Sequence, residues 1–287
     1  MPIRVTFAST DPLSDALVGL ADPERIVKTE TTFGHAVHAF TEHDDPERLR
    51  AELAAAADGV AVAVIDGALA TEDARLILCD VDSTLTTTEA VDLLAEYAGA
   101  GDEVAAITEA AMRGEIDFEQ SLRRRVATLK GLPTSVFEEV YPRMTLSPGA
   151  HELIAAAKER GAKVGVTSGG FTHLVGPLAE ELGLDFMHAN QLEIVSHGGG
   201  EFLTGNVIGK VVDKLQKSLD LRAFAFRQGV PMTHTVAVGD GANDLKMLAT
   251  AALGVAYCAK PVAALQADVA IPFKRLDAVS AFAFPQE

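Results

Sequence analysis

The chain has 287 residues, of which 48% are hydrophobic and 23% are charged, a composition typical of a globular protein with a sizeable core. Its formal net charge of −17 argues against a broad nucleic-acid surface, because no excess of basic residues is available to neutralise phosphates. No apolar run approaches the roughly 18 residues needed to span a bilayer, and no signal-peptide pattern is present. We therefore expect a cytoplasmic protein with no membrane partner.

Residues 1–70 have the pattern of a small unit of their own. Strand-like alternation occurs in IRVTFA, in the two segments that flank Gly34 and in GVAVAVID. Helical spacing occurs in DPLSDALVGL and in DPERLRAELAAAA. The order strand, helix, strand, strand, helix, strand predicts a two-layer α+β sandwich, which the polar segment GALATEDAR connects to the rest of the chain.

From residue 76 the pattern changes to strands that alternate with helices. This alternation favours an α/β fold in which helices cover both faces of a parallel sheet. Cys79 and Cys258 occur in apolar, strand-like runs, so we expect buried, reduced thiols. The candidate strands are residues 76–79, 162–167, 234–239, 253–257 and 268–271.

Two insertions interrupt this alternation. Residues 86–146 contain four amphipathic helical segments and no strand signal, which predicts a helical cap. We expect the cap to lie over the carboxyl ends of the strands, where open parallel sheets place their active sites. A second insertion is expected to be a hairpin that turns at Gly198–Gly200. The catalytic core would then comprise residues 76–85 and 147–287.

The first candidate strand is followed directly by two carboxylates, Asp80 and Asp82, in LILCDVDSTLT. Residues two apart on an extended strand point to the same side, so both could face one pocket. Three interpretations are open at this point: a solvated turn, a metal site without catalysis, or a nucleophile paired with a general acid at a Mg²⁺ ion.

Later segments strengthen the catalytic interpretation. In GVTSGGF a strand ends in Ser168 and two glycines, and a hydroxyl beside exposed backbone N–H groups can hold a phosphate. In VAVGDGANDLKML a strand ends in Asp240, with Asp244 four residues later, and carboxylate oxygens at a strand end suit Mg²⁺. Lys217 lies between these segments on a helical stretch.

The order DxDxT, Ser, Lys, GDGxND resembles the haloacid dehalogenase superfamily of aspartate-dependent phosphohydrolases, over about residues 76–275. The segments FEQSLRRRV, TSGGF, LTGNV, VAVGDGAND and CAKP resemble the phosphoserine phosphatases within that superfamily. The resemblance implies a Rossmann-like core with a helical cap. It also implies Mg²⁺-dependent hydrolysis of O-phospho-L-serine through an aspartyl-phosphate, the last step of serine biosynthesis.

The resemblance also implies a role for each matched residue. Asp80 would be the nucleophile, and Asp82 would be the general acid and base. Mg²⁺ would be held by the Asp80 side chain, the Asp82 backbone carbonyl and Asp240. The phosphate would be bound by Ser168, Gly169, Lys217 and Asn243. Thr84 and Asp244 would lie behind the metal- and phosphate-binding groups and orient them. Counting from LTGNV favours Lys217 over Lys214 as the phosphate-binding lysine.

Substrate specificity is expected to come from the cap. Arg125 would bind the carboxylate of phosphoserine with two hydrogen bonds, and Glu89 would meet its ammonium group. Met112 and Phe118 would form an apolar wall. Arg123 and Arg124 are interpreted as solvated residues of the same helix.

Alternatives remain for both parts of the chain. Residues 1–70 resemble an ACT domain in element order, but their first strand–helix turn, STDPLSD, lacks glycine. A structural role or a homodimer contact is therefore at least as plausible there as amino-acid binding. The core could transfer phosphate to another alcohol or act on a different small metabolite. A receiver-like signalling protein also uses an Asp, a Ser or Thr and a Lys, but the insertion at residues 86–146 disfavours it.

Overall fold

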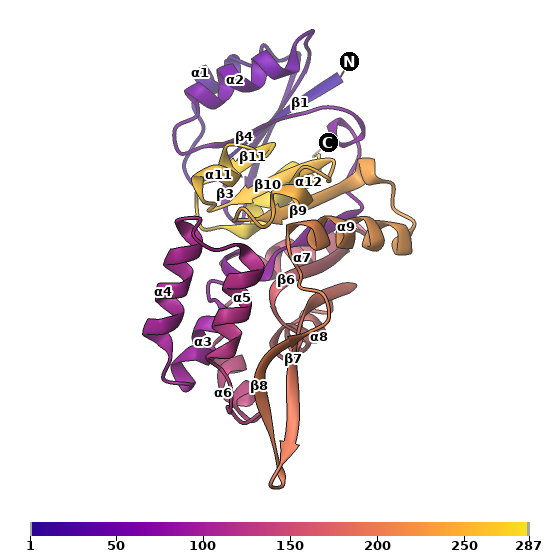
Figure 1. The fold of residues 1–287 in the computed structure, drawn as a ribbon. Coiled ribbons are helices and arrows are strands. Elements are labelled where there is room, and N and C mark those ends of the chain that lie inside the picture. Colours follow the sequence, from indigo (N-terminus) through magenta and orange to yellow (C-terminus); the bar gives the residue numbers. More distant parts are fainter. Residues whose placement is uncertain (1, 286–287) are drawn as a thin grey trace.

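The computed structural model describes residues 2–285, apart from the side chains of Pro2 and Met112. Within this range the strands form two sheets (Figure 1). A four-stranded antiparallel sheet lies near the N-terminus, and a seven-stranded sheet forms the centre of the remaining chain. This arrangement confirms the predicted α/β fold with a small α+β unit before it.

The N-terminal unit has the predicted order of elements. Its sheet has the strand order β2-β3-β1-β4. Val5 and Phe7 point from β1 towards the helices and pack with Leu49 and Leu53 of α2, because alternate residues of a strand face the same side. The elements are β1 (Pro2–Ser9), α1 (Asp15–Gly19), β2 (Arg25–Thr31), β3 (Gly34–Glu42), α2 (Pro46–Ala56) and β4 (Ala61–Ile65).

The opposite face of this small sheet packs on the rest of the molecule. Arg4 is fully buried there, and its guanidinium donates to the backbone oxygens of Leu69, Ala281 and Phe282 at 2.7, 3.1 and 2.9 Å. The apolar side chains of this face belong to the same buried cluster as the strands of the large sheet. The segment predicted as a polar connector takes part as well, because Leu69 is buried in that cluster.

The large sheet has the strand order β11-β10-β9-β5-β6-β7-β8, and neighbouring strands are parallel except β7 and β8. All five predicted strands are present, because buried parallel strands are nearly continuous apolar runs. These strands are β5 (Leu76–Cys79), β6 (Lys163–Phe171), β9 (Thr235–Gly239), β10 (Leu253–Tyr257) and β11 (Val269–Ile271). The helices of this part are α7 (Ala150–Glu159), α8 (Thr172–Glu181), α9 (Lys214–Gln228), α10 (Leu245–Leu248), α11 (Pro261–Ala264) and α12 (Val279–Ala283).

The two insertions lie side by side (Figure 1). The first contains the four predicted helices, and the second is the predicted hairpin, whose strands are joined through Gly198 and Gly199. Three backbone hydrogen bonds of 2.8–2.9 Å join Leu203 and Glu201 of the hairpin to residues 131–134 of the helical insertion. The elements are α3 (Ala90–Tyr97), α4 (Gly101–Met112), α5 (Phe118–Ala127), α6 (Val136–Val140), β7 (Phe186–His197) and β8 (Gly200–Ile208).

One sequence-based expectation about the cysteines is wrong. Cys79 is buried at the end of β5, but Cys258 is exposed. Strand β10 ends one residue earlier, at Tyr257, and the backbone then turns into the left-handed region with φ 43° at Cys258. The chain therefore leaves the sheet at this cysteine, and the thiol is not covered by the layers of the fold.

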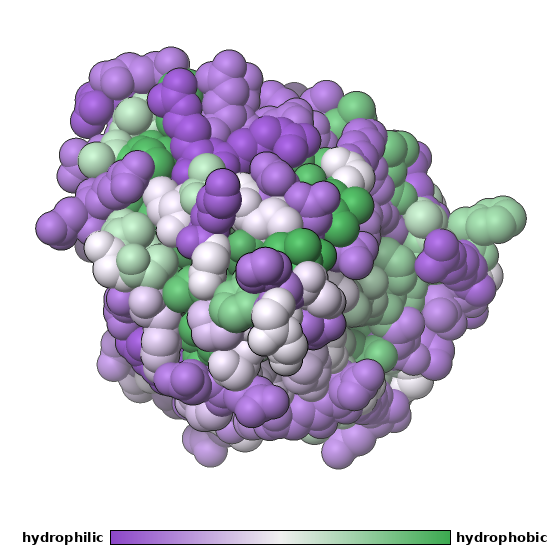
Figure 2. Space-filling view, turned by 60° about the horizontal axis from the view of Figure 1, so that its bottom comes forward, coloured by the Kyte–Doolittle hydropathy of each residue, from purple (hydrophilic) through white to green (hydrophobic). Residues whose placement is uncertain are grey.

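The surface on the cap side is mostly hydrophilic, with hydrophobic residues in small groups among the polar ones (Figure 2). Across residues 2–285, every helix is too short or too polar to traverse a lipid bilayer.

Candidate active site

A cavity of about 780 Å³ lies between the helical cap and the carboxyl ends of the central strands. Residues from the ends of several strands and from three cap helices, α3, α4 and α5, share its wall, so it brings together segments that are far apart in the sequence. Of the predicted site residues, Asp80, Asp82, Glu89, Phe118, Arg125, Gly169, Asp240 and Asn243 line it.

Asp80 follows the last residue of β5 and is 3% exposed. One of its carboxylate oxygens accepts a hydrogen bond of 2.7 Å from the N–H of Val81, and the other lies 2.7 Å from Nζ of Lys217. Lys217 comes from α9, is fully buried and also donates to Asp244 at 2.7 Å. Lys217 is thus the lysine that contacts Asp80, whereas Lys214 lines the cavity.

Asp82 reaches the cavity by a different route from the one expected for an extended chain. The backbone leaves the strand conformation after Asp80 and forms one wide turn over residues 81–85, in which Ser83 has a left-handed φ of 60°. One Asp82 oxygen accepts a hydrogen bond of 2.8 Å from the N–H of Ala90 at the start of α3. The turn thus aims Asp82 at the cavity and anchors it to the cap at the same time.

Ser168 lies on β6, which continues to Phe171 instead of ending in a glycine turn as predicted. The pairing of β6 with β7 shifts register between Ser168 and Phe171, so the two intervening glycines form a bulge. The Ser168 hydroxyl accepts from the N–H of Gly170 at 2.8 Å and lies 3.4 Å from Asp82. A Cβ on Gly170 would lie 2.9 Å from the Asp82 carboxylate, which explains why this position is glycine.

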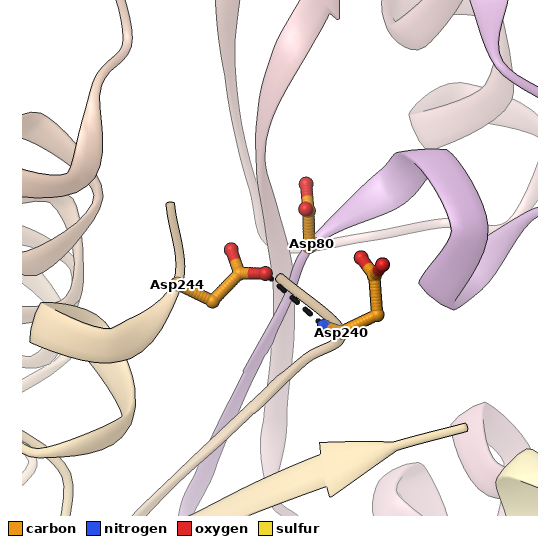
Figure 3. Close-up of side chains that lie close together, drawn as sticks. All are labelled: Asp80, Asp240 and Asp244. Atoms are coloured by element: carbon orange, nitrogen blue, oxygen red, sulfur yellow. Dashed lines mark hydrogen bonds between the residues drawn. The ribbon is translucent and has the colours of Figure 1, made fainter. Parts of the chain in front are cut away.

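Asp240 and Asp244 come from the loop that follows β9 (Figure 3). One Asp244 oxygen accepts from the backbone N–H groups of Asp240 and Gly241 at 3.1 and 2.9 Å, and the other accepts from Lys217. Thr84 lies 3.5 Å from Asp240 through its hydroxyl. Asp244 therefore fixes both the loop that carries Asp240 and the lysine that contacts Asp80.

The carboxylates of Asp80, Asp240 and Asp244 are buried, and one oxygen of each lies within 4.8 Å of the others. Burial and the charge of Asp244 hold the pKa of Asp80 well above its usual range and raise the pKa of Asp240 to about 6. Burial opposes the charge on Lys217, but Asp244 and Asp80 outweigh it and raise the pKa of Lys217. One ammonium cannot neutralise three carboxylates, so a cation with a preference for oxygen ligands fits this cluster.

Asp82 has a different electrostatic environment. Its burial, together with the nearby negative charge of Glu89, raises the pKa of Asp82 to about 7. A carboxyl group with such a pKa can hold a proton near neutral pH and can also release it. The site therefore contains a carboxylate tied to a lysine beside one that is suited to proton transfer.

The cap contributes residues that have no role in this acidic cluster. Nε of Arg125 is buried and has no hydrogen-bond partner among the described residues, and the side chain lines the cavity. Glu89 lines the cavity as well and accepts a hydrogen bond of 2.9 Å from Ser83. Phe118 stands over the β6 bulge, because a Cβ on Gly169 would lie 3.1 Å from its ring.

Not every predicted site residue lines the cavity. Four predicted residues lie behind the cavity wall and are fully buried: Thr84, Ser168, Lys217 and Asp244. The side chain of Met112 is outside the described part of the chain. Arg123 and Arg124 are exposed, as expected.

The cavity wall also includes six charged residues to which no role was assigned from the sequence: Asp92, Asp117, Glu119, Asp213, Lys214 and Lys260. Lys260 belongs to the CAKP segment, so this motif could have indicated that Lys260 lies at the site. Asp92 lies in an ordinary amphipathic helical pattern, where nothing distinguishes it from a solvated acid.

Comparison with known proteins agrees with this architecture. The family of haloacid dehalogenase-like hydrolases matches residues 77–249, and the chain belongs to that family. Within it, the chain is similar to phosphoserine phosphatases. It is 50% identical over 234 residues to phosphoserine phosphatase SerB2 of Mycobacterium tuberculosis, a match that covers 82% of this chain and 56% of that protein.

Two further comparisons extend the similarity. A phosphoserine phosphatase of Streptococcus thermophilus is 52% identical over 196 residues, which cover 68% of this chain and 89% of the relative. A solved structure described as a phospho-aspartyl intermediate analogue of phosphoserine phosphatase has a TM-score of 0.68 and 42% identity, and the match covers 74% of this chain and all of that one. The chain spans little more than half of the length of the mycobacterial relative.

Proposed function

We propose that this protein is a Mg²⁺-dependent phosphatase that hydrolyses O-phospho-L-serine to L-serine and phosphate. The observation that carries the proposal is one cavity that combines two sets of groups. Asp80 contacts Lys217 and belongs to a buried acidic cluster, which suits phosphoryl transfer. Arg125 and Glu89 line the same cavity and offer the charges that complement a carboxylate and an ammonium group.

In the first step, a carboxylate oxygen of Asp80 attacks phosphorus while the bond from phosphorus to the serine oxygen breaks. Asp82 donates its proton to that oxygen, so the product leaves as a neutral alcohol. Its raised pKa, caused by burial and by Glu89, supports this role. The result is an aspartyl-phosphate on Asp80 and an ionised Asp82.

In the second step, Asp82 takes a proton from a water molecule, whose oxygen attacks phosphorus. The bond between phosphorus and the Asp80 oxygen breaks, which releases inorganic phosphate and restores the carboxylate. Lys217 would neutralise phosphate charge during both steps, and the Ser168 hydroxyl with the N–H of Gly169 would hold phosphate oxygens. Asn243 would contact the same group from the loop after β9.

The Asp80 and Asp240 side chains and the backbone carbonyl of Asp82 would hold Mg²⁺, with Thr84 and Asp244 supporting them. The buried excess of carboxylates supports a hard divalent cation at this place. Bound there, the ion would offset the repulsion between an anionic nucleophile and a dianionic phosphate.

The direct experiment is a phosphate-release screen over phosphoserine, phosphothreonine and sugar phosphates, with and without Mg²⁺. We expect phosphoserine to be the preferred substrate and Asp80→Asn to abolish turnover. A preference for sugar phosphates would refute the substrate assignment. Transfer of phosphate to added alcohols in place of water would favour the phosphotransferase alternative.

The specificity of the cap can be tested separately through Arg125. Arg125→Ala should lower kcat/KM for phosphoserine by about 100-fold, because a charge-assisted hydrogen-bonded pair is lost. It should have much less effect on phosphoethanolamine, which has an ammonium group but no carboxylate. Arg124→Ala is the matched control, because Arg124 is exposed on the same helix. Equal losses with both substrates would contradict the proposed contact.

A further inference from the structure

Another buried carboxylate, Asp220, lies outside the cavity and close to the residues behind its wall. Asp220 is 4% exposed and belongs to α9, three residues after Lys217. It accepts three hydrogen bonds: 2.6 Å from the Thr167 hydroxyl, 2.8 Å from Nδ1 of His188 and 2.9 Å from the Gln216 amide. An aspartate with this many donors is fully satisfied, so it does not need a ligand to explain it.

The partners of Asp220 show which elements it joins. Thr167 is on β6 and directly precedes Ser168, and His188 is the residue of β7 that pairs with Thr167. Gln216 is on α9 itself. Asp220 therefore ties the helix that carries Lys217 to the strand that carries Ser168.

The contact between α9 and the sheet has a different character farther along the helix. Farther along the helix, Phe224 stacks on Phe186 with ring centroids 4.9 Å apart, and a Cβ on Gly165 would lie 2.8 Å from the Phe224 ring. These contacts are apolar and non-directional, whereas hydrogen bonds to a charged group fix both distance and direction. In the described part of the chain, the hydrogen bond between Asp220 and Thr167 joins the first half of α9 to β6 in this way.

Stability alone is a poor explanation for this cluster. Burying a carboxylate is costly, and replacing a buried charged cluster with well-packed apolar residues is often neutral or stabilising. We therefore expect Asp220 to matter because it fixes the position of α9 relative to β6. A displacement of about 1 Å between groups that hold a reacting phosphate can cost about 100-fold in rate.

We propose that Asp220 is a positioning residue for the phosphatase reaction, which sets Lys217 and Ser168 at the spacing that a phosphoryl group requires. The inference rests on the function proposed above. Asp220 contacts neither substrate nor cation, and it acts through Thr167 on one side and through the first turns of α9 on the other.

The test compares Asp220→Leu, Asp220→Asn and Thr167→Val with a control variant, Ser218→Ala. Ser218 is on the same helix and hydrogen-bonds to Thr250 at 2.8 Å, away from β6. Binding of inorganic phosphate in Mg²⁺ buffer is measured by calorimetry, together with kcat, KM and the melting temperature.

We expect Asp220→Leu to weaken phosphate binding and to lower kcat/KM by about 10-fold or more, and Asp220→Asn, which keeps an oxygen for Thr167, to recover most of both. Ser218→Ala should affect only the melting temperature. Combining Asp220→Leu with Thr167→Val should lower phosphate affinity and kcat/KM little more than either change alone, because both changes remove the same hydrogen bond.

Phosphate affinity and kcat/KM within twofold of the wild type in Asp220→Leu would overturn the proposal, as would losses that merely follow the melting temperature. If Asp220→Leu does not fold, Asp220→Asn and Thr167→Val decide the question in the same assays. A wild-type protein that binds phosphate but does not turn over phosphoserine would refute the proposed function only, because the phosphate-binding comparison would still test the role of Asp220.

Discussion

His38 should make the stability of the protein depend on pH between 7 and 5. The side chain is fully buried on β3, where the small sheet meets the rest of the molecule. Arg4 donates to the Thr6 hydroxyl at 3.0 Å, and that hydroxyl lies 3.1 Å from Nδ1 of His38. With Arg4 as its donor, Thr6 is free to donate to Nδ1, so the ring is held in its neutral form.

The magnitude follows from the difference between the folded and unfolded chains. Burial, with a contribution from the Arg4 charge, lowers the pKa of His38 from its ordinary 6.5 to about 4. The unfolded chain therefore binds a proton first as the pH falls, and stability present above pH 6.5 is lost on the way to pH 4. The whole effect is about 3 kcal/mol, of which about 2 kcal/mol should be lost between pH 7 and pH 5.

The assay is urea denaturation of the wild type and of His38→Gln at pH 7, 6 and 5. Carboxylates that titrate in this range contribute equally to both proteins, so the difference between their pH slopes isolates His38. His151→Gln is the control, because His151 is exposed at the start of α7 and should leave the slope unchanged. Parallel slopes for the wild type and His38→Gln would refute this reasoning.

Three other predictions address the metal, the division of the chain and a tight turn. Ca²⁺ in place of Mg²⁺ should inhibit phosphate release, because the larger ion tolerates looser coordination, and full activity with Ca²⁺ would argue against the proposed ligand set. We propose residues 1–70 as a separate unit. Deleting them should lower the melting temperature by exposing the core surface around Ala281 and Phe282 that Arg4 contacts, but the folded fraction should keep its turnover. An inactive folded truncation would show that the division is wrong. Gly149→Ala should destabilise the protein in urea by more than Gly131→Ala. Both positions have a φ of +88°, but a Cβ at Gly149 would overlap the Asp277 carboxylate, whereas a Cβ at Gly131 would meet open space.

Most of the fold could be predicted because its elements have strong local patterns. The buried parallel strands are apolar runs with polar residues directly after them, and the four cap helices have clear amphipathic spacing. The exposure of Cys258 could not be predicted in this way. Its position depends on one left-handed residue after β10, and an apolar run does not indicate where the chain leaves a sheet.

The predicted site residues were found through short motifs, and residues outside such motifs were missed. Asp80 and Asp240 stand out because carboxylates at strand ends are unusual. Asp220 gave no signal, since an acid within a helical segment is usually solvated. Its role depends on Thr167 and His188, which only the packing of α9 on the sheet brings to it.

The backbone hydrogen bonds between the hairpin and the cap limit how the cap can move on its own. Residues 131–134 extend the ladder of β8, so the two insertions form one continuous body over the cavity. The two chain segments that enter and leave the cap also pair with each other, at Thr86 and Leu146. A cap that swings open must either carry the hairpin arm with it or give up three backbone hydrogen bonds, at about 1 kcal/mol each. The cap and the hairpin would therefore move as one unit, with bending where the chain enters and leaves the cap near Thr86 and Leu146.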